Sequence, residues 1–99
     1  MARTVNKSDV QPGRLAAFEV EGHQVAVANV GGTFYAFDDT CTHRQCSLAE
    51  GTLDGTTVTC PCHGSEFDVR TGAVLAPPAV QPVKSYRVRV EGDTLKIET

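Results

Sequence analysis

Long apolar runs are missing from this sequence. None approaches the ~20 residues that a membrane-spanning helix needs, so no membrane association is expected. Residues 1–12 also lack the apolar core of a secretory signal peptide, which predicts a cytoplasmic protein. Positive charge is scarce as well: 9 Lys and Arg stand against 12 Asp and Glu, for a net charge of −3. Domains of this size that bind nucleic acid are usually basic, so no nucleic-acid partner is expected.

Helical periodicity is also missing, because no segment repeats apolar residues at helical spacing over three turns. Short alternating segments separated by turn residues are present instead, and this pattern is typical of all-β proteins. Val25 and Val27 alternate with alanines ahead of Gly31-Gly32, and residues 33–37 follow. Since glycine tolerates the positive φ angles of a two-residue turn, this spacing predicts a β-hairpin.

A second hairpin is predicted near the C-terminus. Tyr86, Val88 and Val90 share one face of an expected strand. Leu95 and Ile97 continue this apolar face beyond a turn. Side chains alternate between the two faces of a strand, so this face is expected to be buried.

The stretch from residue 38 to residue 82 differs in composition, because it is rich in Gly, Thr, Pro, Cys and His. Weak β signals remain at residues 57–59, 66–69 and 73–75, and residues 47–50 are predicted to form one helical turn. No repeat, low-complexity tract or charge run divides the chain. We therefore expect one domain of 99 residues whose loop-rich middle carries a site on a β scaffold.

All 4 cysteines and two of the 3 histidines fall in two short segments. The segments are Cys41-Thr42-His43-Arg44-Gln45-Cys46 and Cys60-Pro61-Cys62-His63-Gly64-Ser65. In an intracellular protein, clustered cysteines are more often metal-binding or redox-active than disulfide-bonded. Each segment offers one thiolate and one imidazole from a tight loop. Two such loops that face each other make a site with two sulfur and two nitrogen ligands.

Other chemistries use the same residue types. Attachment of c-type haem needs Cys-x-x-Cys-His, whereas a single residue separates Cys60 from Cys62. A thioredoxin-like pair needs Cys-x-x-Cys at a helix start, and a Cys nucleophile with a His base does not account for duplicated Cys/His pairs. A structural zinc with two Cys and two His ligands fits the ligand count. However, Cys41 and His43 are closer in sequence than the ligands of most zinc knuckles.

A Rieske [2Fe–2S] cluster fits both segments, because two histidines replace two cysteines on one of its irons. Each loop must then reach both irons. A Cys and a His a few positions apart is the spacing that this geometry requires, and both segments have it.

The sequence resembles the Rieske family at these two segments. Thr71-Gly72 and Pro77-Pro78-Ala79 also resemble the proline-bearing loop that covers the cluster in that family. The resemblance extends over roughly the whole chain. It implies an all-β Rieske fold, in which stacked antiparallel sheets carry an inserted, loop-rich cluster-binding subdomain.

The resemblance also implies a division of the chain and a set of ligands. The base would comprise approximately residues 1–38 and 83–99, and the cluster-binding subdomain approximately residues 39–82. The implied cofactor is a [2Fe–2S] cluster. The inner iron would be bound by Cys41 and Cys60. The outer iron would be bound through Nδ1 by His43 and His63.

The remaining two cysteines, Cys46 and Cys62, occupy positions where the Rieske protein of the respiratory cytochrome bc complex carries a disulfide. Many soluble dioxygenase ferredoxins lack this pair. The resemblance implies a bridge that joins two loops otherwise tied only by the cluster. Two buried thiols are the alternative, because the cytosol favours reduced cysteines.

Four residues are implied to tune or shield the cluster. Ser65 matches the position whose hydroxyl bonds a bridging sulfide, whereas Phe67 stands where high-potential members carry a Tyr that bonds a ligand cysteine. Hydrogen bonds to sulfur stabilise the reduced state and raise the potential. We therefore expect a potential in the lower half of the class range of about −150 to +300 mV. Pro77 and Pro78 would exclude water from the cluster.

The resemblance implies an electron-transfer protein rather than an enzyme. It would act as a soluble, monomeric one-electron carrier between a flavin-containing ferredoxin reductase and a terminal oxygenase or similar acceptor. One alternative is the small subunit of a larger reductase, such as nitrite reductase. Another is an interaction module stabilised by zinc.

Overall fold

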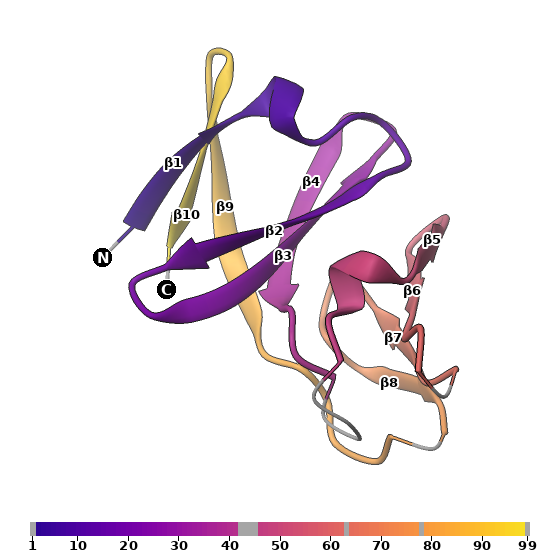
Figure 1. Cartoon of the computed structure of the whole chain (residues 1–99). Helices are drawn as coiled ribbons and strands as arrows, with labels where there is room; N and C mark the ends of the chain where they lie inside the picture. The colour runs from indigo at the N-terminus through magenta and orange to yellow at the C-terminus, as the bar shows by residue number, and fades with distance from the viewer. Residues whose placement is uncertain (1, 42–45, 63, 78, 99) are drawn as a thin grey trace.

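The computed structural model describes residues 2–41, 46–62, 64–77 and 79–98. Its strands form two antiparallel sheets, a six-stranded sheet in the order β1-β10-β9-β4-β3-β2 and a four-stranded sheet in the order β5-β6-β7-β8. The smaller sheet lies at one end of the larger one (Figure 1). The predicted all-β class is confirmed.

The six-stranded sheet forms the base of the molecule. Its strands are β1 (Ala2–Asn6), β2 (Leu15–Val20), β3 (His23–Val30), β4 (Thr33–Asp38), β9 (Ser85–Glu91) and β10 (Thr94–Glu98). Residues of β1 and β2, at the two edges of this sheet, meet in one buried core through Val5 and Val20. The sheet therefore curls around its own core.

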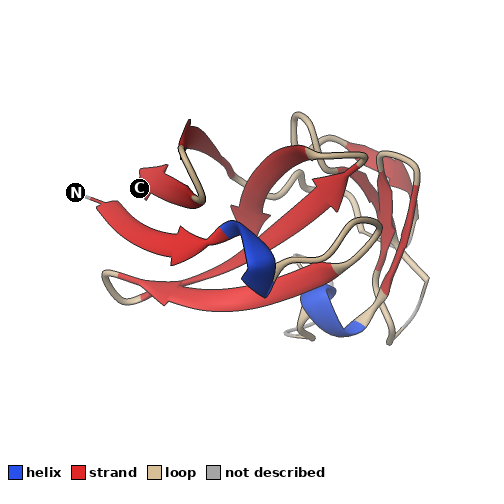
Figure 2. Cartoon of the chain, turned by 90° about the horizontal axis from the view of Figure 1, so that it is seen from above, coloured by secondary structure: helices blue, strands red, loops and turns tan. Residues whose placement is uncertain are grey.

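The four-stranded sheet is formed by the middle of the chain. Its strands are β5 (Thr52–Asp54), β6 (Thr57–Thr59), β7 (Glu66–Asp68) and β8 (Val74–Ala76). Two 3-10 turns, η1 (Lys7–Asp9) and η2 (Leu48–Glu50), complete the regular structure of the described residues (Figure 2). The second of these turns is the helical turn that the sequence predicts. No helix in the described part of the chain has the length and apolar character that a membrane crossing requires.

The predicted N-terminal hairpin is confirmed as β3 and β4. Val30 pairs with Thr33 across the turn, so Gly31 and Gly32 alone connect the two strands. Their φ angles are 58° and 95°. Both glycines thus occupy the left-handed region that a tight turn between twisted strands demands and that other residues enter at a cost.

Both faces of β3 are buried, and the two faces differ in side-chain size. Val25 and Val27 point into the core of the base, whereas Ala26 and Ala28 belong to a second core shared with the small sheet. Phe37 of β4 lies in this second core and is fully buried. The alanine face leaves room for elements of the small-sheet end to pack closely against the base.

The predicted C-terminal hairpin is confirmed as β9 and β10, although its apolar face is buried over only part of its length. Tyr86, Leu95 and Ile97 are buried, but Val88 is half-buried and Val90 is 54% exposed. The hairpin tip projects beyond the neighbouring strands (Figure 1). Since none of the described strands covers this tip, the alternating pattern predicts more burial there than the structure has.

The chain leaves the base after β4 and returns to it at β9. The backbone N–H of Asp38 donates to the carbonyl of Lys84 at 2.8 Å, and the Tyr86 hydroxyl donates to the Asp38 carboxylate. Burial, together with this hydrogen bond, raises the pKa of Tyr86 above its ordinary value, so the phenol stays a neutral donor. These bonds hold the outgoing and returning segments together.

Candidate metal centre

Two loops at the small-sheet end carry the predicted ligand cysteines. We call residues 41–46 the first loop and residues 60–65 the second loop. Cys41 follows β4 and Cys60 follows β6, and both side chains are buried in the second core. The two thiols that the family resemblance assigns to the inner iron therefore lie in the protein interior.

The two loops are closed by equivalent backbone hydrogen bonds. The N–H of Cys41 donates to the carbonyl of Cys46 at 2.9 Å, and the N–H of Cys60 donates to the carbonyl of Ser65 at 2.8 Å. In each loop the bond joins the cysteine to the fifth residue after it. A backbone hydrogen bond of the same spacing thus holds each cysteine at the start of its loop, in two different parts of the chain.

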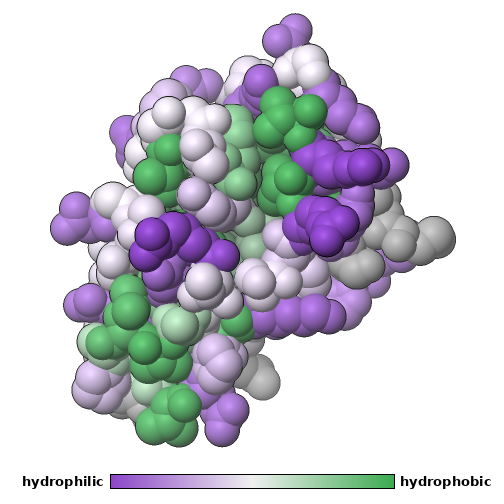
Figure 3. Space-filling model, turned by 180° about the vertical axis from the view of Figure 1, so that it is seen from behind, coloured by the Kyte–Doolittle hydropathy of each residue, from purple (hydrophilic) through white to green (hydrophobic). Residues whose placement is uncertain are grey.

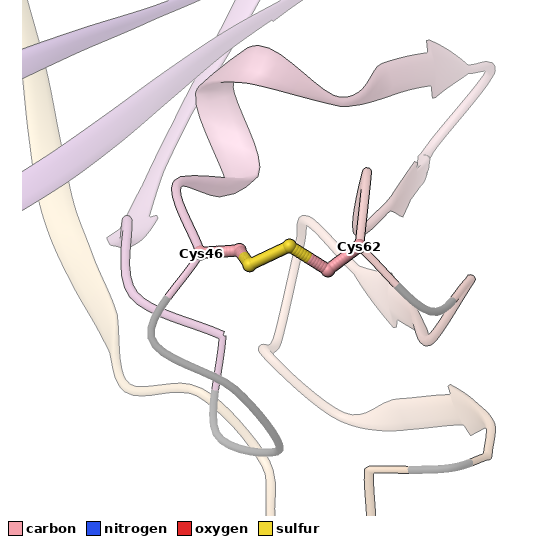
Figure 4. Close-up of a disulfide and its surroundings, with 2 residues drawn as sticks. All are labelled: Cys46 and Cys62. Atoms are coloured by element: carbon pink, nitrogen blue, oxygen red, sulfur yellow. A yellow bond between two sulfur atoms is a disulfide. The ribbon is translucent and has the colours of Figure 1, made fainter.

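A disulfide between Cys46 and Cys62 joins the two loops in the structure (Figure 4). The sequence resemblance points to the same two cysteines. Cys46 is half-buried and Cys62 is exposed. The Sγ of Cys60 lies within 4.8 Å of both bridged sulfurs. One predicted ligand cysteine is therefore adjacent to the bridge.

Three of the predicted site residues, His43, His63 and Pro78, lie outside the described residues. The other predicted site residues are described: the thiol ligands, the two bridged cysteines, and three of the four residues expected to tune or shield the cluster. In order, these are Cys41 and Cys60, Cys46 and Cys62, and Ser65, Phe67 and Pro77.

Ser65 connects the second loop to the segment that contains the prolines. Its side chain is fully buried, and its Oγ accepts a hydrogen bond from the N–H of Ala79 at 3.0 Å. A hydroxyl that accepts one bond still has its own proton to donate. The hydrogen bond from Ala79 therefore leaves the Ser65 proton available for a second partner.

Residues 73–82, which carry the prolines, form a segment that comes back to nearly the point where it started. We call this segment the excursion. The N–H of Val83 donates to the carbonyl of Gly72 at 2.9 Å, so the ends of residues 73–82 meet. Within the excursion Ala79 is buried, whereas Leu75 is 52% exposed and Val80 is 82% exposed. Figure 3 shows apolar side chains gathered on the outside of the molecule at this end, as well as over the base.

Phe67 occupies the middle of β7, where it pairs with Val58 of β6. Its ring is fully buried in the same core as Cys41 and Cys60. A phenyl ring has no hydrogen-bond donor. The position therefore contributes packing to the core around the thiols but no bond to sulfur.

Asp68, next along β7, organises the turn that leads into the excursion. Its carbonyl accepts the N–H of Gly72 at 2.7 Å, and its carboxylate pairs with Arg70 at 2.9 Å. The side-chain hydrogen bond from Arg70 lowers the pKa of Asp68. This carboxylate thus stays charged and keeps the turn after β7 in place.

The sequence did not identify Asp39, which is a structural anchor of the first loop. The Asp39 side chain is buried, with its Oδ1 accepting the N–H of Ala49 at 2.8 Å and its Oδ2 accepting the hydroxyl of Ser47 at 2.6 Å. The carbonyl of Asp39 also accepts the N–H of Leu48 at 2.6 Å. The residues on either side of the first loop are held together by these bonds. The only signal in the sequence is an acidic residue directly after the strand β4, upstream of the short helical turn η2.

Replacement of Asp39 by alanine is expected to lower the free energy of unfolding by about 2 kcal/mol, because a partly buried N–H and a partly buried hydroxyl lose their acceptor. Asp39→Asn keeps one carbonyl oxygen for Ala49 and can donate to Ser47, so a loss of about 1 kcal/mol or less is expected. Urea unfolding of both variants measures this difference. Asp54→Ala, at an exposed carboxylate of β5, is the control and should be near neutral. Equal losses for the alanine and asparagine variants would contradict the anchoring role.

The chemistry of these donors fits a metal–sulfur centre. Two buried thiols come from two loops of equivalent geometry, and a buried hydroxyl with a proton to donate lies at the end of the second loop. Soft thiolate ligands select iron–sulfur clusters, copper(I) or zinc over hard cations.

Comparison with known proteins identifies the family. The Rieske [2Fe-2S] domain matches residues 2–87 of this chain. The chain belongs to this family, and the resemblance stated from the two Cys/His segments is confirmed. The cofactor of the family is a [2Fe–2S] cluster.

The relatives narrow the class within the family. The ferredoxin component of biphenyl 2,3-dioxygenase from Rhodococcus jostii is 37% identical over 99% of this chain and 92% of its own length. A biphenyl dioxygenase ferredoxin subunit from a Pseudomonas species is 42% identical over 91% of this chain and 84% of its own length. The chain is therefore an electron carrier of the ferredoxin type, as predicted, and not itself a catalytic enzyme.

Solved structures agree with this assignment. The ferredoxin of carbazole 1,9a-dioxygenase from Nocardioides aromaticivorans superposes with a TM-score of 0.92 at 36% identity, over 96% of this chain and 93% of that one. A small subunit of nitrite reductase from Mycobacterium tuberculosis has a TM-score of 0.87 but only 22% identity, over 98% of this chain and 93% of that one. The second likeness shows a shared fold alone. The comparisons thus favour the dioxygenase ferredoxins over the reductase-subunit alternative, and the iron–sulfur centre over structural zinc.

Proposed function

We propose that this protein passes single electrons to the terminal oxygenase of a multicomponent dioxygenase and receives them from a flavin-containing ferredoxin reductase. The observation that carries the proposal is the similarity over nearly the whole chain to ferredoxin components of dioxygenases. A solved relative with 40% identity and a TM-score of 0.91, over 97% of this chain and 91% of that one, is described as a complex of reduced oxygenase and oxidised ferredoxin. That pairing supports an oxygenase as the acceptor here.

The proposed ligands are Cys41 and Cys60 for the inner iron and His43 and His63 for the outer iron. Their support is the burial of both thiols and the equivalent closure of the two loops. When bound, the cluster supplies a site that accepts and releases one electron. The protein's own contribution is to hold two thiolates in a dry core, to aim the Ser65 hydroxyl, and to shield the site with the excursion of residues 73–82.

The disulfide between Cys46 and Cys62 is proposed to be the resident state of these cysteines in the cytoplasm. A bridge beside a cluster can resist reduction by the glutathione pool when its potential is low enough. The bridge joins two loops that come from different strands, so it limits their separation. The division into a base of residues 1–38 and 83–99 and a subdomain of residues 39–82 is part of the same proposal.

The surface near the second loop is proposed to contact the oxygenase. Leu75 and Val80 are exposed on the excursion, and Val80 follows the residue that bonds to Ser65. Exposed apolar side chains beside a redox centre suit a small, transient interface. The net charge of −3 favours attraction to a basic face on the partner. The carrier is proposed to act as a monomer, which gel filtration tests.

Stopped-flow mixing tests the proposed acceptor. The protein is reduced, then mixed with a purified dioxygenase terminal oxygenase or with a nitrite reductase large subunit, and reoxidation is followed by absorbance. Fast reoxidation by the oxygenase is expected. Val80→Ser should slow this step, whereas Val90→Ser, at the exposed tip of the far hairpin, should not. Reoxidation by the nitrite reductase alone would overturn the proposal.

Replacement of Phe67 by tyrosine is expected to raise the reduction potential. The new hydroxyl can donate to a nearby sulfur, which stabilises the reduced, more negative cluster. One hydrogen bond of about 1 kcal/mol corresponds to a shift on the order of 40 mV for a one-electron couple. A redox titration measures the shift. Phe34→Tyr adds the same group at a half-buried ring that packs against the core of the base, and it should leave the potential unchanged. An unchanged or lower potential for Phe67→Tyr would contradict the expectation.

A further inference from the structure

Three cysteine sulfurs meet between the two loops. The Sγ atoms of Cys46, Cys60 and Cys62 all lie within 4.8 Å of one another, and the first and last of them form the disulfide. A disulfide exchanges when a third sulfur attacks one of its two sulfurs as a thiolate. The fold thus holds Cys60 beside a bond with which it can react.

We infer that Cys60 exchanges into this disulfide when it is not engaged as a cluster ligand. The inference rests on the proposed ligand set and the proposed disulfide. The Cys60 thiolate attacks Sγ of Cys46, a Cys46–Cys60 bond forms, and the Cys46–Cys62 bond breaks. Cys62 leaves as a thiolate and takes up a proton, while the Cys60 thiol has lost one. The number of thiols and disulfides is unchanged, so the step needs no outside oxidant or reductant.

The surroundings of the three sulfurs select the product. Cys62 is exposed, so water solvates its thiolate as it leaves, whereas Cys46 is half-buried. Attack on Cys62 would instead close a small ring across Pro61, whose backbone φ is fixed. A bond between Cys46 and Cys60 is therefore the expected product.

The exchange changes what the two loops can bind. It removes Cys60 from the ligand set and leaves Cys62, an exposed residue, as the new thiol. Cluster assembly then requires release of Cys60, either by the reverse exchange, in which the Cys62 thiolate attacks Sγ of Cys46, or by an external thiol that reduces the Cys46–Cys60 bond. Release of Cys60 must accordingly come before cluster insertion whenever the chain has lost its cluster.

Mapping of the thiols in the full-length holoprotein tests this inference. The cluster is removed with an iron chelator, without oxygen or added thiol, and the protein is quenched in acid, alkylated in denaturant and digested without reduction. Mass spectrometry locates the labelled cysteines. Before chelation the label is expected on Cys41 and Cys60. After chelation it is expected on Cys41 and Cys62, with Cys46 and Cys60 in one linked peptide.

Two variants that each lack one proposed ligand make a matched pair. Cys41→Ser retains Cys60, so the Cys46–Cys60 bond is expected in the purified protein. Cys60→Ser has no attacking sulfur and should keep the Cys46–Cys62 bond. Retention of the Cys46–Cys62 bond in the chelated protein and in Cys41→Ser would overturn the inference, as would a Cys60–Cys62 bond. Label on all four cysteines of the holoprotein would instead refute the proposed disulfide, so the two failures are distinguishable.

Discussion

Replacement of Cys60 by serine is expected to abolish cluster binding, whereas replacement of Cys62, two residues further on, is expected to leave the cluster bound. Thiolates are the ligands that hold iron in such clusters, and a serine hydroxyl is a poor substitute. Cys60 is buried among the core residues, while Cys62 is exposed and belongs to the disulfide. The two variants thus separate the ligand role from the bridging role in one loop.

Iron and sulfide content per chain, together with the visible absorbance, measures the outcome. Cys62→Ser loses a bridge that spans 16 residues of sequence, so its free energy of unfolding should fall by about 3 kcal/mol. Its cluster is therefore expected to be lost faster on heating. A cluster retained in Cys60→Ser but absent from a folded Cys62→Ser would show that the two cysteines are assigned the wrong way round.

Replacement of Gly72 by alanine is expected to lower the free energy of unfolding by about 4 kcal/mol or more, which places it among the largest effects of single substitutions. A Cβ at this position would lie 1.9 Å from the carbonyl oxygen of Val83. That carbonyl belongs to the backbone, so no side-chain rotation relieves the overlap. The N–H of Val83 also donates to the Gly72 carbonyl, and movement of either segment breaks this bond.

Gly55→Ala is the matched control for Gly72→Ala. Both glycines have positive φ, 60° at Gly55 and 84° at Gly72, but a Cβ at Gly55 would meet nothing within 4 Å. The backbone penalty alone, about 1–2 kcal/mol, is expected there. Chemical denaturation of both variants measures the difference in the free energy of unfolding. The cluster of Gly72→Ala should also be lost more readily, because the contact between Gly72 and Val83 that closes the excursion (its neck) opens. Equal destabilisation by both variants would contradict the steric argument.

The hairpins and the Cys/His segments were predictable because their signals are local. Gly31-Gly32 between alternating residues specifies a tight turn, and two short segments contain every cysteine of the chain. Other strands gave no such signal. β2 has the sequence LAAFEV, which does not alternate, and β1 and β5 are short strands with a single large apolar residue each. They form strands because β3, β10 and β6 pair with them.

The site residues, too, could be predicted only where their signal is local in the sequence. Ser65 and Phe67 could be singled out from the resemblance, whereas Asp39 could not, because its three partners become neighbours only after folding. The bond between Gly72 and Val83 is likewise invisible in the sequence. It joins residues that are separated by the whole excursion.

By itself, the sequence determined the class of this protein. Repeated Cys/His spacing, turn glycines and alternating apolar residues are properties of near neighbours, so they can be read without coordinates. Only the tertiary structure decided which contacts hold the site: the Asp39 anchor, the neck at Gly72, and the position of Cys60 beside the Cys46–Cys62 bond. These contacts join residues from different segments, and their distances are set by the folded path of the chain between those segments and not by any local pattern.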